Sequence, residues 1–106
     1  MDYSSVYELI KHIPVGKVTT YGIIARKAGI KSPRTVGWVL HKNSDPQNVP
    51  CHRVVNFRGA VAANYAFGGE AVQRKKLESE GVEFVGGRVE MNKYLFNMED
   101  NVKAKF

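Results

Sequence analysis

The segment TYGIIARKAGIKSPRTVGWVLHK, residues 20–42, decides the fold. Thr20 can cap a first helix, and Gly29 can end it. After a short turn, Ser32 can cap a second helix that has Pro33 at its first position. Two short helices joined by a tight turn with a glycine are typical of a helix-turn-helix, whose second helix is the recognition element. The alternative is an ordinary helical hairpin that packs into a core.

The second helix of this segment has an apolar side and a basic side. Three apolar residues at helical spacing predict contact with the core: Val36, Val39 and Leu40. The basic residues lie off that stripe, on the face left to solvent: Arg34, His41 and Lys42. A basic outer face on a recognition helix suits DNA, and it favours the helix-turn-helix over the plain hairpin.

The flanking segments complete the prediction of a mostly α-helical domain with one small β-hairpin. Apolar and polar residues alternate on both sides of Gly86-Gly87, which predicts a hairpin on a two-glycine turn. A helix-turn-helix followed by a hairpin indicates a winged helix-turn-helix, DNA-binding fold. The predicted elements are helices over 4–12, 21–28, 33–42 and 70–80, a turn over 56–59, a loop over 60–69, a hairpin over 82–85 and 88–91, one helical turn over 92–95 and a frayed tail over 98–106.

Length and hydropathy limit the class of protein. With 106 residues, 43% of them hydrophobic, the chain has room for one domain, which we assign to residues 1–106. No apolar run is long enough for a membrane span, and no export signal precedes the first helix. We therefore expect a location in the cytoplasm, or in the nucleus of a eukaryote. We also expect the chain to act as a monomer.

Charge and cysteine content narrow the partners. Sixteen Lys and Arg against ten Asp and Glu give a net charge of +6, which favours a polyanion such as DNA, RNA or an anionic membrane. The single cysteine excludes an internal disulfide and fits a reducing compartment. One cysteine and three histidines at scattered spacing form no zinc pattern, so we expect neither a metal nor a cofactor.

The single cysteine lies in the stretch Pro50-Cys51-His52-Arg53-Val54-Val55. A neighbouring imidazole or cation lowers the pKa of a thiol and raises its thiolate fraction, and the thiolate is the nucleophile. This setting predicts a reactive Cys51. The alternative is that Cys51 is one more small buried hydrophobe, because adjacency in sequence does not bring two side chains together.

Further motifs surround this stretch between about Tyr7 and Gly81. They are Ile13-Pro14-Val15-Gly16-Lys17-Val18, Thr20-Tyr21-Gly22, Arg34-Thr35-Val36-Gly37, Asn43, Asn64-Tyr65, Gly68-Gly69 and Glu80-Gly81. In this order, and with Pro-Cys-His-Arg-Val intact at residues 50–54, the chain resembles the O6-alkylguanine-DNA alkyltransferase family, also called methylated-DNA-protein-cysteine methyltransferase. No membrane is expected as a partner on this basis.

The resemblance implies stoichiometric repair of DNA. Cys51 would attack the alkyl carbon of O6-alkylguanine, restore the guanine and end as a thioether that cannot react again. His52 would be linked to the thiol through water and oriented by Glu80, whose place at a helix C-terminus is electrostatically poor for an acid and so favours a functional role. Tyr21 would help to rotate the nucleotide and act near the base, and Asn43 would brace the turn before the active site.

The resemblance also implies base flipping from the minor-groove side of double-stranded DNA, since a thiolate cannot reach a stacked base. Arg34 would be the finger that fills the vacated space. Gly37 would let the helix approach the groove closely, although close helix-helix packing would explain a helical glycine equally well. The expected DNA surface also includes Thr35, His41, Lys42 and Arg53, and the expected pocket includes Leu40, Val54 and Tyr65.

Length and C-terminal sequence point to a second reading. Residues 77–84 and Tyr94-Leu95-Phe96 resemble the alkyltransferase-like proteins, which usually carry tryptophan in place of the cysteine. Those proteins bind O6-alkylguanine without repairing it and flag it for nucleotide excision repair proteins. The loop over 62–69 departs from the enzymes' pattern, which leaves the width of the pocket and the preferred alkyl group open. A winged-helix regulator is a third reading, and a preference for one unmodified DNA sequence would support it.

Overall fold

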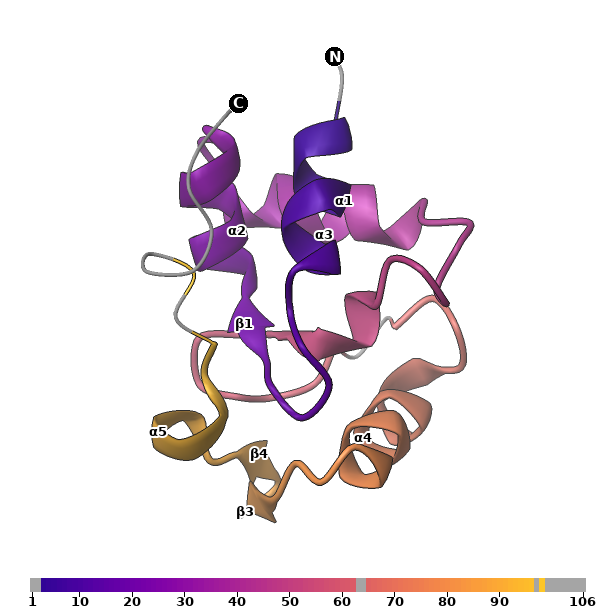
Figure 1. The fold of residues 1–106 in the computed structure, drawn as a ribbon, viewed down its shortest axis with the longest axis vertical. Coiled ribbons are helices and arrows are strands. Elements are labelled where there is room, and N and C mark those ends of the chain that lie inside the picture. The colour runs from indigo at the N-terminus through magenta and orange to yellow at the C-terminus, as the bar shows by residue number, and fades with distance from the viewer. Residues whose placement is uncertain (1–2, 63–64, 97, 99–106) are drawn as a thin grey trace.

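The predicted helix-turn-helix is present in the computed structural model of the chain, which describes residues 3–62, 65–96 and 98. Helix α2 spans Tyr21–Ala28 and helix α3 spans Pro33–His41, so α3 ends one residue before the predicted end. The two helices pack directly against each other (Figure 1). The winged-helix prediction is confirmed by this pair together with the hairpin described below.

Both predicted helix caps are confirmed by their hydrogen bonds. Thr20 Oγ1 accepts from the Ile23 amide at 3.1 Å, and Ser32 Oγ accepts from the Arg34 amide at 3.2 Å. Each bond satisfies an amide that has no partner within its own helix. The cap at Thr20 fixes where α2 begins, so it also fixes the position of the next residue, Tyr21.

Helix α1 spans Ser4–Lys11 and packs against α2 to complete a three-helix group at one end of the molecule (Figure 1). Its apolar side faces the main core, which buries residues of all three helices at helical spacing. The fully or almost fully buried members from these helices are Val6, Leu9, Ile10, Ile24, Val36 and Val39. The apolar stripe predicted for α3 is therefore the side that holds the helix to the protein.

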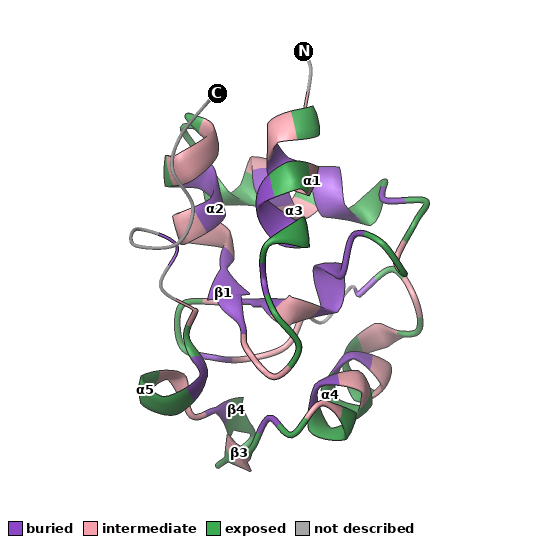
Figure 2. Cartoon of the chain, in the orientation of Figure 1, coloured by how far each residue is buried: buried purple, intermediate pink, exposed green. Residues whose placement is uncertain are grey.

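A short parallel pairing lies between this helical group and the rest of the chain, and the sequence did not predict it. Strand β1 spans Thr19–Thr20 and strand β2 spans Val54–Val55, with Thr19 opposite Val54. A turn of 3₁₀ helix, η1, spans Cys51–Arg53 and leads directly into β2. The pairing therefore holds the strand that follows the cysteine turn beside the strand that leads into α2. Figure 2 shows β1 as fully buried.

The other end of the molecule holds helix α4, Gly69–Ser79, the hairpin of β3, Phe84–Val85, and β4, Arg88–Val89, and helix α5, Met91–Tyr94 (Figure 1). The strands pair antiparallel across Gly86 and Gly87, which both have positive φ, so the predicted two-glycine hairpin is confirmed. A second, smaller core lies here, and it contains Val18, Val55, Leu77, Val82, Val89 and Tyr94.

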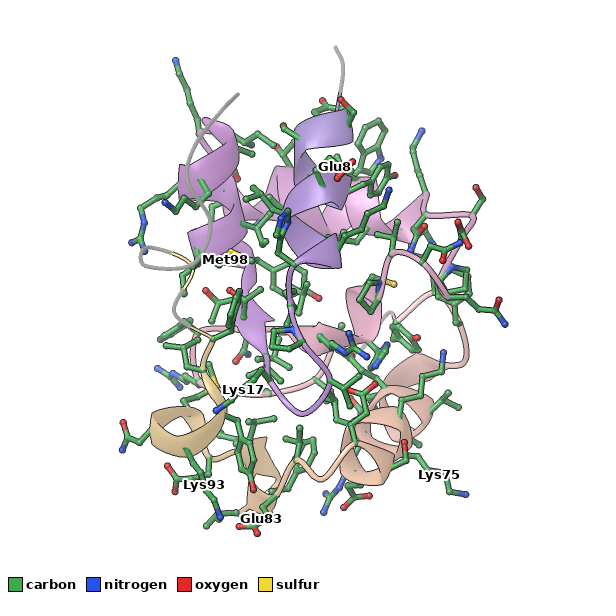
Figure 3. The ribbon with its side chains drawn as sticks, in the orientation of Figure 1. Glu8, Lys17, Lys75, Glu83, Lys93 and Met98 are labelled. Carbon is green, nitrogen blue, oxygen red and sulfur yellow. The ribbon has the colours of Figure 1, made fainter. Side chains whose placement is uncertain are left out.

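A close backbone contact fixes the wing formed by β3 and β4. The Val89 amide donates to the Gly59 carbonyl at 2.9 Å, and a Cβ added at Gly59 would lie 2.6 Å from the Val89 carbonyl oxygen, so only glycine fits this turn. Lys93 and Glu83 form an exposed ion pair of 3.2 Å beside the wing (Figure 3). Of the predicted frayed tail, Met98 is buried in the main core, and the remainder lies outside the described residues.

Candidate active site

A cavity of about 980 Å³ opens beside α3, and Cys51 forms part of its wall. Side chains from α2, α3, the cysteine turn and the loop after β2 line it. The lining residues are Tyr21, Pro33, Arg34, Gly37, Trp38, Leu40, His41, Cys51, Ala62, Tyr65 and Ala66. Seven of the residues singled out from the sequence therefore meet at one cavity: Tyr21, Arg34, Gly37, Leu40, His41, Cys51 and Tyr65.

Cys51 is 5% exposed and begins the turn η1. Burial raises the pKa of the Cys51 thiol, and the opposing effects of an Asn43 hydrogen bond, the Lys76 charge and a backbone hydrogen bond reduce this rise without cancelling it. The site thus contains a desolvated thiol with polar neighbours. It is neither a bare core cysteine nor a freely ionised thiolate.

Asn43 lies where it can hold the turn that leads to Cys51. Its Nδ2 donates to the Val49 carbonyl at 2.9 Å, and its Oδ1 accepts from the Asp45 amide at 2.9 Å. A single buried side chain thereby satisfies backbone groups at both ends of the bend between α3 and the cysteine turn. This is the bracing position that the family resemblance implied.

His52 and Glu80 are brought together from segments that lie 28 residues apart. His52 Nε2 is 2.7 Å from Glu80 Oε2, and both side chains are largely buried. Because an ionised carboxylate can only accept hydrogen bonds, Nε2 carries the proton and Nδ1 is the basic nitrogen of the neutral ring. Burial lowers the pKa of His52, and the hydrogen bond and charge of Glu80 offset this only in part.

Arg53 occupies the interior of this network, which corrects its expected place on the DNA surface. Its Nε donates to Glu80 Oε1 and its Nη2 to Glu80 Oε2, both at 2.9 Å, while Nη1 donates to the Ile13 carbonyl at 2.8 Å. The Arg53 side chain is 13% exposed. A guanidinium that is held by a bidentate bond and a backbone carbonyl has its donors directed inward, so we assign Arg53 to positioning Glu80.

Glu80 is the C-cap of α4, and its partners explain how an acid is tolerated there. Burial opposes ionisation of Glu80, but the hydrogen bonds from Arg53 and His52, together with their charges, outweigh it and hold the pKa of Glu80 below its usual value. The carboxylate is therefore ionised at neutral pH and can orient the imidazole.

These shifts predict that the domain loses stability as the pH falls. His52 and Glu80 both have lowered pKa values in the folded state, so the unfolded chain binds more protons on acidification. The loss from His52 should begin below about pH 6.5 and that from Glu80 below about pH 4.3, the ordinary pKa values. Urea unfolding at a series of pH values measures this. A free energy of unfolding that is constant or rises from about pH 7 to about pH 5 would contradict the assignment of His52.

Gln73 is a residue of the site that the sequence reasoning missed. It is fully buried in α4, its Nε2 donates to the carbonyls of His52 at 3.0 Å and Val54 at 2.9 Å, and its Oε1 accepts from the Ala62 amide at 2.8 Å. Gln73 therefore ties α4 to the cysteine turn. The available signal was its position four residues before Leu77, on the inner side of the predicted helix.

Val54 does not lie at the cavity where the pocket prediction placed it. Its side chain is fully buried in the main core, and its carbonyl oxygen accepts from Gln73. Successive side chains of a strand point to opposite sides. In β2 the Val54 side chain therefore enters the main core, and the side chain of the next residue, Val55, enters the smaller core. Leu40 and Tyr65, the other predicted pocket residues, do line the cavity and are buried to 6% and 8% exposure.

The outer face of α3 carries the residues predicted to contact DNA. Arg34, His41 and Lys42 are exposed, and Thr35 is half-buried. A Cβ added at Gly37 would meet only Tyr21 Cε1, at 3.9 Å, which is ordinary contact. Internal packing therefore does not require this glycine, which removes the alternative of close helix-helix packing.

Trp38 was not identified from the sequence, although it stands one turn after Arg34. It is 54% exposed and lines the cavity. Lys42 Nζ lies 4.0 Å from the centre of its ring, and the Tyr3 ring meets it edge-on at 6.3 Å. An exposed aromatic at this position extends the apolar wall of the cavity toward solvent.

Tyr21 is held at the cavity by the start of α2. Burial, together with the charge of Cys51, raises the pKa of Tyr21 to about 12, so its hydroxyl remains a proton donor at neutral pH.

Among the described residues, no group of three or more His, Cys, Asp or Glu is placed to hold a metal ion. In the same part of the chain, every helix is too short or too polar to cross a membrane.

Comparison with known proteins identifies relatives along most of the chain. Residues 2–82 match the family described as "6-O-methylguanine DNA methyltransferase, DNA binding domain". A bifunctional methyltransferase/endonuclease of Picrophilus torridus is 37% identical over 93% of this chain and 33% of its own length. Alkyltransferase-like protein 1 of Schizosaccharomyces pombe is 38% identical over 92% of this chain and 90% of its own length. The chain thus spans one third of the first relative and nearly all of the second.

A solved structure agrees with these matches. The crystal structure of Schizosaccharomyces pombe Atl1 in complex with damaged DNA containing O6-carboxymethylguanine has a TM-score of 0.79 and is 36% identical. The alignment covers 90% of this chain and 94% of that one. The family match and the structural match therefore agree on the family and the fold of this chain.

Proposed function

This chain belongs to the 6-O-methylguanine DNA methyltransferase family, and from that membership we propose that it repairs O6-alkylguanine in duplex DNA by transferring the alkyl group to Cys51 in one irreversible step. The observation that carries the proposal is the position of Cys51 in the cavity wall. The next residue in the chain, His52, is paired with Glu80. We place this activity where DNA is found, in the cytoplasm or, in a eukaryote, in the nucleus.

The reaction uses groups that are all part of this chain. The thiol proton passes to the free nitrogen of His52, and the Glu80 carboxylate stabilises the resulting imidazolium. The Cys51 thiolate then attacks the alkyl carbon, so the C–S bond forms as the C–O6 bond breaks. The electron pair of the broken bond stays on guanine, which takes up one proton. The products are intact guanine and a thioether on Cys51, and each protein molecule acts once.

Duplex DNA is the proposed partner because the target carbon is inaccessible in a stacked base. The basic face of α3 would lie in the minor groove, with Gly37 allowing the close approach and Arg34 at the rim of the cavity. Among the described residues, no carboxylate pairs with Arg34, so its guanidinium is available to fill the space that a flipped nucleotide leaves.

A lesion sensor that does not repair is the second candidate function. Two observations favour it. Burial raises the pKa of the Cys51 thiol, which reduces the thiolate fraction at neutral pH, and the similarity extends over 90% of an alkyltransferase-like protein. In that case the chain would bind O6-alkylguanine in the same cavity and leave its removal to nucleotide excision repair proteins.

The intact mass of the protein after incubation with a duplex that contains one O6-methylguanine separates the two candidates. Alkyl transfer adds the mass of one methylene group to the protein, and peptide mapping should locate it at Cys51. Tight binding to the methylated duplex with no gain in mass would assign the chain to the sensing class.

Arg34→Ala should weaken the reaction on duplex DNA far more than the reaction with a free O6-alkylguanine base. Unstacking a base costs a few kcal/mol, and loss of the group that offsets it should slow transfer from the duplex at least about tenfold. Transfer from the free base requires no flipping and should change by less than about threefold. Single-turnover kinetics with both substrates measure the two rates.

Arg26→Ala is the matched control for this variant. Arg26 is exposed on α2 and does not line the cavity. Its replacement by alanine lowers the net charge by the same amount as that of Arg34. The control separates a finger role from a general loss of attraction to phosphate. Equal losses in the two variants, or equal losses on duplex and free base, would argue against the finger.

A further inference from the structure

Lys76 is a cation on the inner side of α4 that the reaction described above does not use. It is half-buried, and its Nζ donates to the Tyr65 hydroxyl at 2.8 Å. The same Nζ lies 5.2 Å from the centre of the Tyr65 ring and 5.8 Å from that of the Phe67 ring. In the described part of the chain, no carboxylate forms an ion pair with Lys76. Its charge is therefore held among aromatic groups and is not neutralised.

The hydrogen bond between Lys76 and Tyr65 has only one possible direction. An ammonium carries donors and no acceptor, so the Tyr65 oxygen accepts and keeps its own proton. Tyr65 lines the cavity together with Cys51. The bond consequently anchors the half-buried ammonium on a buried phenol that forms part of the cavity wall. A charge that is partly desolvated in this way acts over a greater distance than one at the surface.

Several elements around the cavity contribute groups whose titration is coupled to the charge of Cys51. Tyr7 of α1, Tyr21 of α2 and Tyr65 of the loop are neutral phenols whose pKa values burial and the Cys51 charge raise. For Tyr65 the bond from Lys76 opposes this rise. Asn43 supplies an amide, and His52 is held as a neutral ring next to its Glu80 partner. Lys76 is the cation of α4 whose charge favours a negative sulfur, and its bond to Tyr65 places it behind a residue that lines the same cavity as Cys51.

We propose that Lys76, anchored on the Tyr65 hydroxyl, is a positioning residue for the alkyl transfer that holds a positive potential over the Cys51 sulfur. This inference rests on the proposed function for its role in repair, but its effect on the thiol can be measured without DNA. Burial opposes the charged sulfur and also the charged imidazole, so the site needs a fixed cation that compensates the thiolate. Lys76 supplies that cation without occupying the cavity, whose lining does not include it.

The test uses the rate at which iodoacetamide alkylates Cys51, measured against pH in the absence of DNA. Cys51 is the single cysteine of the chain, so the reagent reports on one thiol. In Lys76→Met the midpoint of the profile should move to higher pH. The rate at about pH 7 should then fall roughly three- to tenfold, because raising the pKa of a thiol by about one pH unit lowers its thiolate fraction to roughly one tenth. Lys76→Arg keeps the charge and should restore most of the rate.

Lys75→Met is the matched control, because it removes the same charge from the neighbouring residue of α4. Lys75 is exposed, and Figure 3 shows its side chain extending from α4 away from the rest of the protein. Its profile should coincide with that of the unchanged protein. Tyr65→Phe keeps the lysine but removes its anchor, and its profile should lie between those of the unchanged protein and Lys76→Met. Thermal unfolding of each variant checks that it is folded, and Lys76→Gln replaces Lys76→Met if the latter is not.

A Lys76→Met profile that coincides with that of the unchanged protein would overturn the inference. An equal shift in Lys75→Met would also overturn it, since the effect would then be one of overall charge. A Tyr65→Phe profile identical to that of the unchanged protein would show that the anchor has no part in it. Transfer from a duplex with one O6-methylguanine is measured in parallel. If the unchanged protein transfers no methyl group, the proposed function fails, while the iodoacetamide profiles still decide the role of Lys76.

Discussion

Cys51→Ser is expected to abolish alkyl transfer while leaving the affinity for alkylated duplex DNA within about threefold of its original value, a difference of less than about 0.7 kcal/mol. Serine has nearly the same shape, and its hydroxyl can form hydrogen bonds at the place that the sulfur occupies now. It is not ionised at neutral pH, so the nucleophile is lost. Intact mass after incubation and fluorescence anisotropy with a labelled duplex measure the two quantities.

The two measurements on Cys51→Ser test different parts of the proposal, and an unexpected result in each has a different meaning. Binding depends on α3 and the cavity, and Cys51 is only one of the residues that line it. A large loss of binding would therefore indicate that Cys51 has a structural role in the cavity wall. A methyl group found on Cys51→Ser protein would show that another residue accepts it, which contradicts the proposed mechanism.

Glu80→Gln is expected to destabilise the folded domain by about 3 kcal/mol at neutral pH, because it leaves the largely buried Arg53 guanidinium without its counter-charge. Glutamine keeps the shape of the side chain, but its NH₂ group faces donors of Arg53 and His52. A domain of this size typically has about 5–15 kcal/mol of stability in total, so the midpoint of thermal unfolding should fall by roughly 12 °C or more. Differential scanning calorimetry measures it.

The same substitution should slow alkyl transfer at temperatures where the variant is still folded. Loss of the carboxylate removes the group that orients His52 and stabilises its cation, and proton transfer by such a group contributes on the order of 100-fold. Transfer at the original rate would mean that the 2.7 Å contact between His52 and Glu80 has only a structural role.

Glu78→Gln is the matched control for the stability effect. Glu78 lies in the same helix and forms an ion pair of 3.3 Å with Arg74, but the two side chains are 49% and 46% exposed. An exposed pair of this kind contributes at most about 0.5 kcal/mol. Equal destabilisation by the two substitutions would show that burial of the Arg53–Glu80 pair is not the cause.

Local chemistry made the helices and the wing predictable. The caps at Thr20 and Ser32 and the paired glycines at 86–87 act through bonds and dihedral angles within a few residues, so the sequence alone contains the necessary information. The apolar stripe of α3 is a further example, since helical periodicity fixes which side is buried. The family, too, follows from the order of short motifs, and it is confirmed by the match over residues 2–82.

The arrangement of the site depends on contacts between distant segments. Arg53 was expected at the DNA because it is basic and adjoins the cysteine, but its partners are Glu80 and the Ile13 carbonyl, 27 and 40 residues away. Gln73 was overlooked because its partners also lie in distant segments of the chain. A polar side chain in an inner helical position becomes informative only when the carbonyls that it satisfies are known.

The sequence by itself determined the helix-turn-helix, the wing, the candidate nucleophile and the family of this protein. The tertiary structure alone decided that β1 pairs in parallel with β2, which joins the strand after the cysteine turn to the strand that leads into α2. It also decided that Arg53 faces inward and that Lys76 reaches Tyr65. The physical reason is that capping and periodicity act between neighbours in the chain, whereas burial, pKa and ion pairing depend on which distant groups share one desolvated volume.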